Sequence, residues 1–586
     1  MEKFNKDFTF MRYWMALVFL RDHLKLHTPQ PLSLDAFTAA LACTKRNTQL
    51  VIKRLCLEEI IDWQPGIGRG NLPVITLRQP VAETLVQQAR LLLAEDKIEQ
   101  ALSLIEATQR DTFIANYVAQ YQTANAQEDI LKIPFYRGTH NLDPISINRR
   151  TEQHIAGYLY AKLLQFDPVN GRFRGDLAQH WQRDGNTLTV TLRKGLKFHD
   201  ASPITAKDIR AHFERLIHSG HQNAALYQLI DRVEVLDPYR IAFTSQVLPA
   251  QLEKLLANGP MGIAKCSGQP GNSTLVGSGS FMLTEQTEWR TLLKASPYYH
   301  GYRPWVDGVA IWNVGDQATD FELNSDVVHS SHLKHRSTER FDAKTQWERG
   351  AEYLLLNPNR PHRWLKKPAH RKALMTALKA LGVSDALRED GIGQATGMLS
   401  VPGPAPDCDP AAAAHALHSV PKPEQPLQLL TYQLDHHLEL AQHLASELTQ
   451  LGIACEYRVV EFPVFNQRDT LKTADIILSG EVFGDDWEMS WLDWFCANLP
   501  LEICLNEAQR QGLKDSILSL MQRDNIASRL KGFEKLEKQL IAKHLYLPVF
   551  HARQNLNFSE TVSATDLLAN GWIDFNTVTI TPQPST

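Results

Sequence analysis

The chain lacks the features that would assign it to a membrane, to a disulfide-bonded scaffold or to a familiar catalytic mechanism. No segment approaches the roughly twenty consecutive apolar residues that a membrane-spanning helix needs. The sequence has no HExxH, GxSxG or GxxxxGK[ST] motif, and no GxGxxG follows a predicted strand. We therefore expect a protein that is not an enzyme and that makes no contact with a membrane.

Cysteine is scarce and scattered. The seven cysteines are odd in number and include no CxxC pair, which argues against a disulfide framework and against a zinc site and favours free thiols in a reducing compartment. They are Cys43, Cys56, Cys266, Cys408, Cys455, Cys496 and Cys504.

What is present is an ordinary globular composition on a long chain. The 586 residues suffice for several domains, and 43% hydrophobic with 22% charged residues is typical of globular proteins. The apolar segment from Met11 to Leu20 has the length of a signal-peptide core, but the basic residues before it are offset by acidic ones and no small-residue cleavage site follows. We interpret it as a buried helix, and we expect the protein to be cytoplasmic.

Residues 33–71 have the pattern of a winged helix-turn-helix. Ser33 is a suitable N-cap for a short amphipathic helix that ends near Cys43, and Thr44 can cap a second helix. The apolar face of the second helix consists of Val51, Ile52 and Leu55. Two short apolar segments, Ile60–Trp63 and Val74–Leu77, flank a glycine-rich tip, as the strands of a wing do.

The second helix has the side chains of a recognition helix for double-stranded DNA. Amide side chains suit adenine edges in the major groove, cations suit guanine or phosphate, and a wing arginine suits the backbone or the minor groove. The residues predicted to contact DNA are Thr44, Lys45, Arg46, Asn47, Gln49, Lys53, Arg69 and Asn71. Residues 1–80 contain 11 Lys and Arg against seven Asp and Glu, whereas the whole chain has a net charge of −4. A winged helix that binds protein is the alternative.

After the wing, residues 80–127 keep one apolar face over several helical turns without a sustained heptad repeat. We interpret this segment as a helical connector between the winged helix-turn-helix of residues 1–79 and the rest of the chain.

Motifs in the remaining residues resemble those of the family 5 extracellular solute-binding proteins, the peptide and nickel binders of ABC importers. In chain order, the segments that carry the resemblance are Leu142-Asp143-Pro144, Gly175 to Trp181, Leu192 to Asp200, Pro203 to Ile209, Gly277 to Phe281, Pro297 to Asp307 and Leu547 to Phe550. The resemblance implies an α/β fold overall, with a two-lobed, type II periplasmic-binding-protein-like domain at residues 128–580. It further implies a first lobe of about 128–345 and 545–580 and a second lobe of about 350–544.

A winged helix joined to such a domain is similar to the SgrR-type transcription regulators. Cys43 to Arg46 and Gly68-Arg69-Gly70 resemble the start of the recognition helix and the wing of that group, and Arg149 to Ala156 and Gly571 to Phe575 resemble its ligand domain. The resemblance implies a regulator that senses a small-molecule effector, a sugar phosphate or a similar compound. The alternative function is the solute-binding component of an ABC importer for peptide or sugar.

Two segments are candidates for the ligand site. Arg149 and Arg150 precede a predicted helix and can receive an anion. Asp486, Trp487 and Trp491 lie where importer relatives carry an aspartate and a tryptophan that meet the ligand. His329, His332 and His335 recur at three-residue spacing, but no further residue completes a metal site, and a solvated histidine-rich helix is favoured. We expect no metal and no cofactor.

Overall fold

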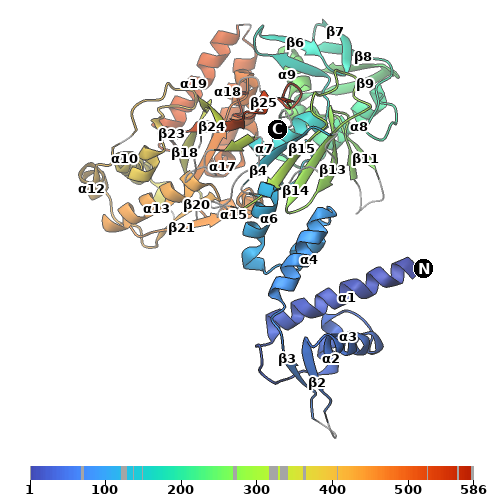
Figure 1. Cartoon of the computed structure of the whole chain (residues 1–586). Coiled ribbons are helices and arrows are strands. Elements are labelled where there is room, and N and C mark those ends of the chain that lie inside the picture. Colours follow the sequence, from blue (N-terminus) through green and yellow to red (C-terminus); the bar gives the residue numbers. More distant parts are fainter. Residues whose placement is uncertain are drawn as a thin grey trace.

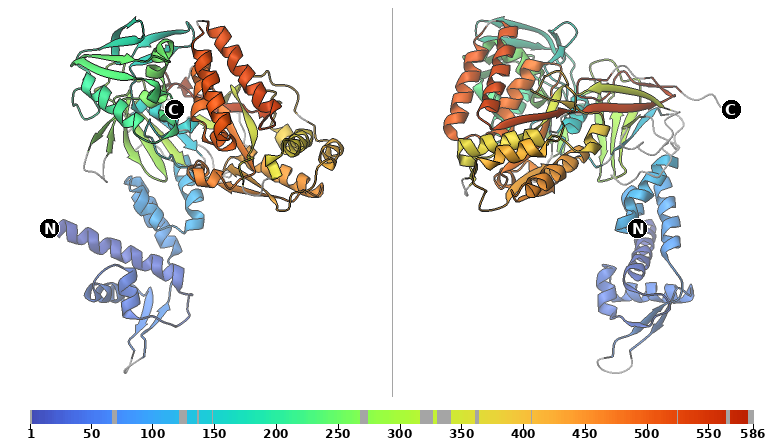
Figure 2. Two further views of the ribbon diagram at one scale, coloured as in Figure 1. Left: turned by 180° about the vertical axis from the view of Figure 1, so that it is seen from behind. Right: turned by 90° about the vertical axis from the view of Figure 1, so that its left-hand side faces the viewer.

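The structure is a computed structural model of the whole chain. It describes residues 2–66, 71–120, 128–135, 137–147, 149–267, 274–315, 327–329, 341–360, 364–405, 407–523, 525–563 and 567–581. In these ranges, no helix combines the length and the apolar character that crossing a membrane requires. All seven cysteines lie in them and are free thiols. The fold consists of an N-terminal unit, a group of connecting helices and a two-lobed α/β body (Figures 1 and 2).

The N-terminal unit is a winged helix. Its elements are α1 (Glu2–His23), β1 (Gln30–Pro31), α2 (Leu34–Ala40), α3 (Lys45–Leu57), β2 (Ile61–Gln64) and β3 (Val74–Leu77). The strands pair in the order β1-β3-β2, so the wing is the antiparallel β2–β3 pair. The Ser33 hydroxyl accepts a hydrogen bond from the Ala36 N–H at 3.0 Å, and the Thr44 hydroxyl accepts one from the Asn47 N–H at 3.3 Å. Both predicted caps are therefore confirmed.

The core of this unit is formed by the faces that the sequence pattern predicts. Leu17 and Leu20 of α1 are fully buried, which confirms the predicted buried helix at Met11–Leu20. They pack with the buried side of α3, which includes Val51 and Leu55.

The connecting helices are α4 (Ala82–Ala94), α5 (Ile98–Ser103), η1 (Ala107–Gln109) and α6 (Arg110–Gln120). They lie between the winged helix and the body (Figure 1). One continuous apolar cluster contains Leu17 of α1, Leu85 and Leu93 of α4, and Trp312 and Val314 of the body. Because these side chains share one core, the winged helix is packed against the body through the connecting helices.

The first lobe contains two four-stranded sheets. The first, in the order β13-β14-β15-β4, is the one that meets the connecting helices, and the second has the order β7-β8-β10-β9. The strands of the lobe are β4 (Ile130–Phe135), β5 (Leu164–Asp167), β6 (Arg172–Gly175), β7 (Ala178–Asp184), β8 (Thr187–Leu192), β9 (Arg232–Asp237), β10 (Arg240–Thr244), β11 (Lys265–Ser267), β12 (Thr274–Val276), β13 (Phe281–Gln286), β14 (Arg290–Ala295) and β15 (Gly308–Asn313). Its helices are α7 (Arg150–Leu159), α8 (Ala206–Ile217), η2 (Gln222–Ala224), η3 (Tyr227–Leu229), η4 (Pro249–Gln251), α9 (Leu252–Ala257) and η5 (Gly259–Met261).

The second lobe is built on a six-stranded sheet in the order β19-β23-β18-β22-β20-β21. Its strands are β18 (Gly350–Leu356), β19 (Gly393–Gln394), β20 (Leu427–Tyr432), β21 (Cys455–Val460), β22 (Ile476–Val482) and β23 (Tyr546–His551). Its helices are η7 (Trp364–Lys366), α10 (Pro368–Leu381), α11 (Asp385–Glu389), α12 (Pro410–His418), α13 (Asp435–Gln450), α14 (Phe462–Phe465), α15 (Arg468–Leu471), α16 (Trp487–Ala497), α17 (Leu499–Cys504), α18 (Glu507–Met521) and α19 (Ile526–Ala542).

The chain leaves the second lobe later than the sequence predicts. The predicted return to the first lobe is at residue 545, but β23 pairs with β18 inside the six-stranded sheet. All six residues of β23 are buried, and they complete the apolar centre of that sheet. The crossing instead follows Ala552, where β24 (Arg553–Ser559) pairs with β16 (Val327–His329) and β17 (Phe341–Trp347). The last strands, β25 (Val562–Ser563) and β26 (Thr579–Ile580), form a short pair.

Candidate functional site

The exposed face of α3 is polar and positively charged. All of the residues predicted on this helix are exposed, namely Thr44 at its N-cap, Lys45, Arg46, Asn47, Gln49 and Lys53. Thr48 lies on the opposite, buried face, where its hydroxyl is 3.0 Å from that of Thr38 in α2. This contact fixes α3 against α2 and directs the polar face outward. The first turn of α3 contains no acidic residue, so the helix dipole adds to the positive charge of that end.

Lys45 and Asn71, two of the residues predicted to contact DNA, are both exposed, but Lys45 already has an acidic partner. Lys45 forms an ion pair with Asp35 of α2, with 2.5 Å between Nζ and Oδ1, and both side chains are mostly exposed. Asn71 is exposed just before β3. Arg69, the predicted wing arginine, lies outside the described residues.

A cleft of about 410 Å³ separates the two lobes of the body. The first lobe contributes the start of α7 and the segment around Asn258, and the second contributes β18, β22 and the starts of α13 and α17. Its basic, acidic and histidine lining residues are Arg149, Arg150, Lys162, Glu348, Glu352, His436, Glu481 and Asp493. Acidic and basic groups face each other in this cleft, which suits a polar ligand that carries more than one kind of group.

Both predicted arginines line the cleft. Arg149 precedes α7, and its guanidinium lies 5.1 Å from the ring centroid of Phe462, which belongs to the second lobe. Arg150 forms an ion pair with Glu348, at the entrance to β18. Arg149 and the first turn of α7 therefore both contribute to the cleft from the first lobe.

Two partly buried carboxyl groups that line the cleft were missed by the sequence prediction. Burial, followed by the charge of Asp493, raises the pKa of Glu481 to about 8, and Asn498 donates a hydrogen bond to this carboxyl group at 3.5 Å. Burial also raises the pKa of Asp493 to about 7, although the amide of Asn258 donates to it at 3.1 Å from the first lobe. At neutral pH these groups carry protons for part of the time and can donate hydrogen bonds to a ligand.

The predicted ligand residues on α16 do not line the cleft. Asp486 is the N-cap of α16, accepts from the Met489 N–H at 3.1 Å and forms an ion pair of 2.6 Å with Lys254 of α9. Trp487 is 44% exposed and is not one of the residues that line the cleft, whereas Trp491 is only 1% exposed and stacks on Phe533 in the core. The turns of α16 direct these side chains to the lobe contact, to the surface and to the core, so none of the three predicted residues lines the cleft.

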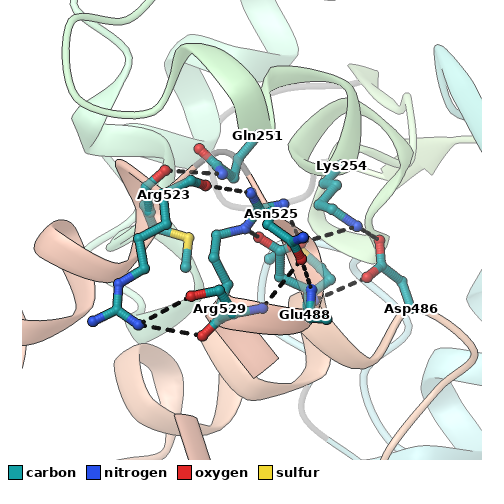
Figure 3. A network of polar contacts seen from close by, with 11 residues as sticks. Gln251, Lys254, Asp486, Glu488, Arg523, Asn525 and Arg529 are labelled. Atoms are coloured by element: carbon teal, nitrogen blue, oxygen red, sulfur yellow. Dashed lines mark hydrogen bonds and ion pairs between the residues drawn. The ribbon is translucent and has the colours of Figure 1, made fainter. Parts of the chain in front are cut away.

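The ion pair of Asp486 belongs to a network that joins the lobes (Figure 3). Lys254 Nζ of the first lobe also lies 3.6 Å from the carboxylate of Glu488, which Arg529 of α19 holds with contacts of 2.7 and 3.0 Å. Close by, the side-chain amide of Gln251 donates to the Met521 carbonyl at 3.5 Å. Lys254, Glu488 and Arg529 are buried, so this network stabilises the contact between the lobes in a region of low dielectric.

The acidic and histidine side chains at the base of the cleft were also missed. Glu352 stands in β18, a strand whose seven residues are all buried. Two features of the sequence could have indicated these residues. One is a single charged residue in an otherwise apolar strand, and the other is the adjacent pair His436 and His437. Two of the three predicted histidines, His332 and His335, lie outside the described residues.

Comparisons with known proteins agree with this geometry. A family model described as bacterial extracellular solute-binding proteins, family 5 middle, matches residues 172–500. A second family model, described as the N-terminal part of the sugar transport-related sRNA regulator, matches residues 12–129.

Several relatives match nearly the whole chain. The chain is 23% identical to the HTH-type transcriptional regulator SgrR of Photorhabdus laumondii, over 94% of this chain and 95% of that protein. It is 24% identical to the uncharacterized protein YhjP of Bacillus subtilis, over 93% of this chain and 95% of that protein.

Solved structures share the fold of the body. The murein tripeptide binding protein MppA of Escherichia coli has a TM-score of 0.63 at 17% identity and covers 78% of this chain and 99% of its own. The periplasmic binding protein DppA of Helicobacter pylori, solved with the peptide STSA, has a TM-score of 0.64 at 17% identity. The match covers 79% of this chain and 100% of that protein.

Proposed function

The chain belongs to the bacterial extracellular solute-binding proteins of family 5, and we propose that it is a DNA-binding transcription regulator whose two-lobed body senses a small metabolite. Its N-terminal part matches the sugar transport-related sRNA regulators, and SgrR-type regulators match it over nearly their whole length. This combination favours a regulator over the solute-binding component of an importer. We propose that it acts in the cytoplasm, where it meets DNA, and that its role is binding rather than catalysis.

The observation that carries the proposal is the shared core between the winged helix and the ligand-binding body. The proposed parts are the winged helix of residues 1–79, the connector of 80–127 and the ligand domain of 128–580. Trp312 of β15 packs edge-on against Tyr117 of α6, with ring centroids 6.0 Å apart, inside the cluster that also contains the core of α1. A change in the first lobe is therefore passed to the recognition helix through packed side chains.

A chain of contacts also links the cleft to that core. Glu152 follows the two cleft arginines in α7, and its carboxylate holds the buried guanidinium of Arg137 with contacts of 2.6 and 3.1 Å. Arg137 follows β4, which pairs in parallel with β15, the strand of Trp312. A ligand that moves α7 acts on the same sheet that contacts the connector.

The effector that this cleft fits is a polar molecule with an anionic group. The start of α7 and Arg149 supply N–H donors and a positive charge for a phosphate or a carboxylate. The carboxyl groups of Glu481 and Asp493 supply hydrogen bonds for hydroxyl groups on the other wall. We propose a sugar phosphate as the first effector to test. Because Arg149 of the first lobe also contacts Phe462 of the second lobe, a ligand that binds Arg149 favours one arrangement of the lobes.

The test is the binding of the purified full chain to a labelled DNA fragment from upstream of its own gene. Fluorescence anisotropy is measured at several salt concentrations, with glucose 6-phosphate, with glucose or with inorganic phosphate. The proposal predicts saturable binding that random DNA competes for poorly and that the sugar phosphate alone changes by about fivefold or more. Equal binding to any DNA, unchanged by all three compounds, contradicts the proposal.

A further inference from the structure

Three potential metal ligands converge at the base of the cleft. Nε2 of His437 lies 2.6 Å from one carboxylate oxygen of Glu352, and Nε2 of His436 lies 3.1 Å from the other. One ligand atom from each residue lies within 4.8 Å of the other two. His436 and Glu352 line the cleft, whereas His437 is fully buried behind them.

The ring of His437 has a partner at each nitrogen. The Thr431 hydroxyl lies 2.9 Å from Nδ1 of His437 and 3.1 Å from the Leu478 carbonyl oxygen. Nε2 of the same ring faces a carboxylate oxygen of Glu352. These contacts fix the orientation of the imidazole toward Glu352.

A neutral imidazole nitrogen and a carboxylate oxygen are both metal ligands, so an ion can take a position shared by these three side chains. We infer that Glu352, His436 and His437 form a binding site for a divalent transition-metal ion, such as Zn²⁺ or Ni²⁺, in the interlobe cleft. The sequence predicts no metal here because the glutamate is separated from the histidines by more than eighty residues.

The donor set and its surroundings fit such an ion. Two imidazoles and one carboxylate suit Zn²⁺, Ni²⁺, Co²⁺ or Cu²⁺ rather than Mg²⁺ or Ca²⁺. Bond lengths of about 2.0–2.2 Å place neighbouring ligands roughly 3.4 Å apart, so the contact of 2.6 Å between His437 and Glu352 needs to lengthen by less than about 1 Å. The hydroxyl of Thr431 orients His437 as outer-shell groups orient ligating histidines in metal sites.

The charges that face the site are also suitable. Glu348 and Arg150 are paired beside it, and with Glu352 they leave one net negative charge to attract a cation. Burial and the neighbouring Asp493 keep Glu481 largely protonated at neutral pH, its pKa being about 8, so it adds little charge.

The backbone leaves room for the carboxylate. Gly480 of β22 lies opposite Glu352, and a Cβ at this position would be 1.8 Å from the carboxylate. With three protein ligands and one side open to the cleft, a metal ion keeps a free position for a ligand atom of a bound metabolite. This effector role rests on the proposed function, but metal binding itself does not.

The first experiment measures metal binding by the full chain without a histidine tag. After treatment with a chelator and dialysis, the protein is titrated with Zn²⁺, Ni²⁺ and Mg²⁺ by calorimetry, and Co²⁺ binding is followed by its visible absorption spectrum. We expect one equivalent of Zn²⁺ or Ni²⁺ to bind, with weaker binding at pH 5.5 because protons compete for the imidazoles, and no binding of Mg²⁺. No stoichiometric binding of Zn²⁺, Ni²⁺ or Co²⁺ overturns the inference.

Variants locate the site. His436→Ala changes a residue whose side chain is 25% exposed, so we expect it to fold and to bind the metal at least tenfold more weakly. Glu352→Gln keeps the shape of the buried side chain and should weaken binding likewise. His180→Ala, on the exposed surface of β7, is the matched control and should bind as the unaltered chain does. Unchanged affinity in His436→Ala overturns the inference, as does a loss of binding in a variant that replaces both His332 and His335.

The effector role is measured separately, by DNA binding with and without Zn²⁺. A metal that binds with one equivalent and alters DNA affinity in the unaltered chain, but not in His436→Ala, supports the effector role. If the metal binds but DNA affinity is unchanged, the metal site is supported and the role of the metal as effector is rejected. If the protein does not bind specific DNA at all, the proposed function fails while the metal titration still decides the site.

Discussion

The guanidinium of Arg290 in β14 donates two hydrogen bonds, of 2.6 and 2.9 Å, to the carboxylate of Asp96 in the turn between α4 and α5. The Arg290 side chain is 3% exposed and lies 5.0 Å from the ring centroid of Trp312, whereas the Asp96 side chain is 56% exposed. A buried cation of the ligand-binding body is thus paired with a residue of the connector. This pair is a direct polar link between the two, beside the apolar contacts of the shared core.

The first prediction tests this link with Asp96→Asn. Asparagine tolerates the left-handed backbone at this position, where φ is 59°, and Arg290 keeps its second partner, Glu285. We expect a stability loss of about 1 kcal/mol or less, with effector and DNA affinities retained but with the effect of effector on DNA affinity reduced to about twofold or less. Thermal unfolding and anisotropy measure these quantities.

The matched control for that prediction is Glu95→Gln, which removes a charge one residue away. Glu95 pairs with Lys97 on the surface of the connector. Wild-type coupling in Asp96→Asn, or the same loss of coupling in both variants, would refute a specific role for the Arg290–Asp96 pair.

A second prediction concerns the contact between the lobes. Lys254→Met leaves Asp486 without its partner from the first lobe, so we expect the open arrangement to gain population and the radius of gyration in X-ray scattering to increase. The double variant with Asp486→Asn should recover part of the loss because it removes the uncompensated charge. Arg210→Gln, which breaks an ion pair with Glu214 within α8, is the control and should leave scattering unchanged. Identical scattering from all four proteins would count against the role of this network.

The third prediction concerns the recognition helix. Arg46→Ala and Lys53→Ala each remove an exposed cation of α3, so we expect DNA binding to weaken by roughly tenfold. The slope of log affinity against log salt should fall by about one unit for each lost phosphate contact, while effector affinity stays the same. Lys97→Ala in the connector removes the same charge away from α3 and serves as the control. Loss of effector binding together with DNA binding would instead indicate misfolding.

The fourth prediction is a pH dependence of stability. Burial raises the pKa of Glu481 from 4.5 to about 8, so its neutral form favours the folded state at low pH. Because the unfolded state releases this proton first, the free energy of unfolding falls as the pH rises from about 4.5 to about 8. Glu481→Gln should therefore show a smaller drop in melting temperature between pH 5 and pH 8 than the unaltered chain. Glu439→Gln, on the exposed face of α13, should follow the unaltered chain, and parallel curves for all three proteins would disprove the assignment.

The fifth prediction separates two tryptophans of α16 that the sequence places in the ligand site. Trp491 is buried against Phe533, so Trp491→Ala should lower the free energy of unfolding by about 3–5 kcal/mol. Trp487 is 44% exposed, and Trp487→Ala should change the free energy of unfolding by no more than about 0.5 kcal/mol. Chemical denaturation measures both, and neither variant should change effector affinity while it is folded. A folded Trp487→Ala that no longer binds the effector would restore the original prediction for that residue.

Local patterns were sufficient for the winged helix. Ser33 and Thr44 cap helices because their side chains satisfy N–H groups within three residues, and Val51 and Leu55 face the core because helical spacing puts them on one side. The exposed cations of α3 follow from the same spacing. Such interactions join neighbours in the chain, so the sequence states them directly.

The ligand site depended on contacts that the sequence does not state. Arg149 and Arg150 were predicted because a helix start favours anions, and both line the cleft. Asp486 was predicted by its position in the chain, but its carboxylate turns to Lys254, which is more than two hundred residues away.

The sequence by itself determined the winged helix, the motifs of the two-lobed body and the cleft arginines, because each depends on short-range spacing or on a run of characteristic residues. Only the tertiary structure decided that β23 stays in the second lobe, that Glu352 meets His436 and His437, and that Arg290 meets Asp96. These pairs depend on how sheets and lobes pack. The free energy of burying a charge is recovered only where the fold brings its partner into contact.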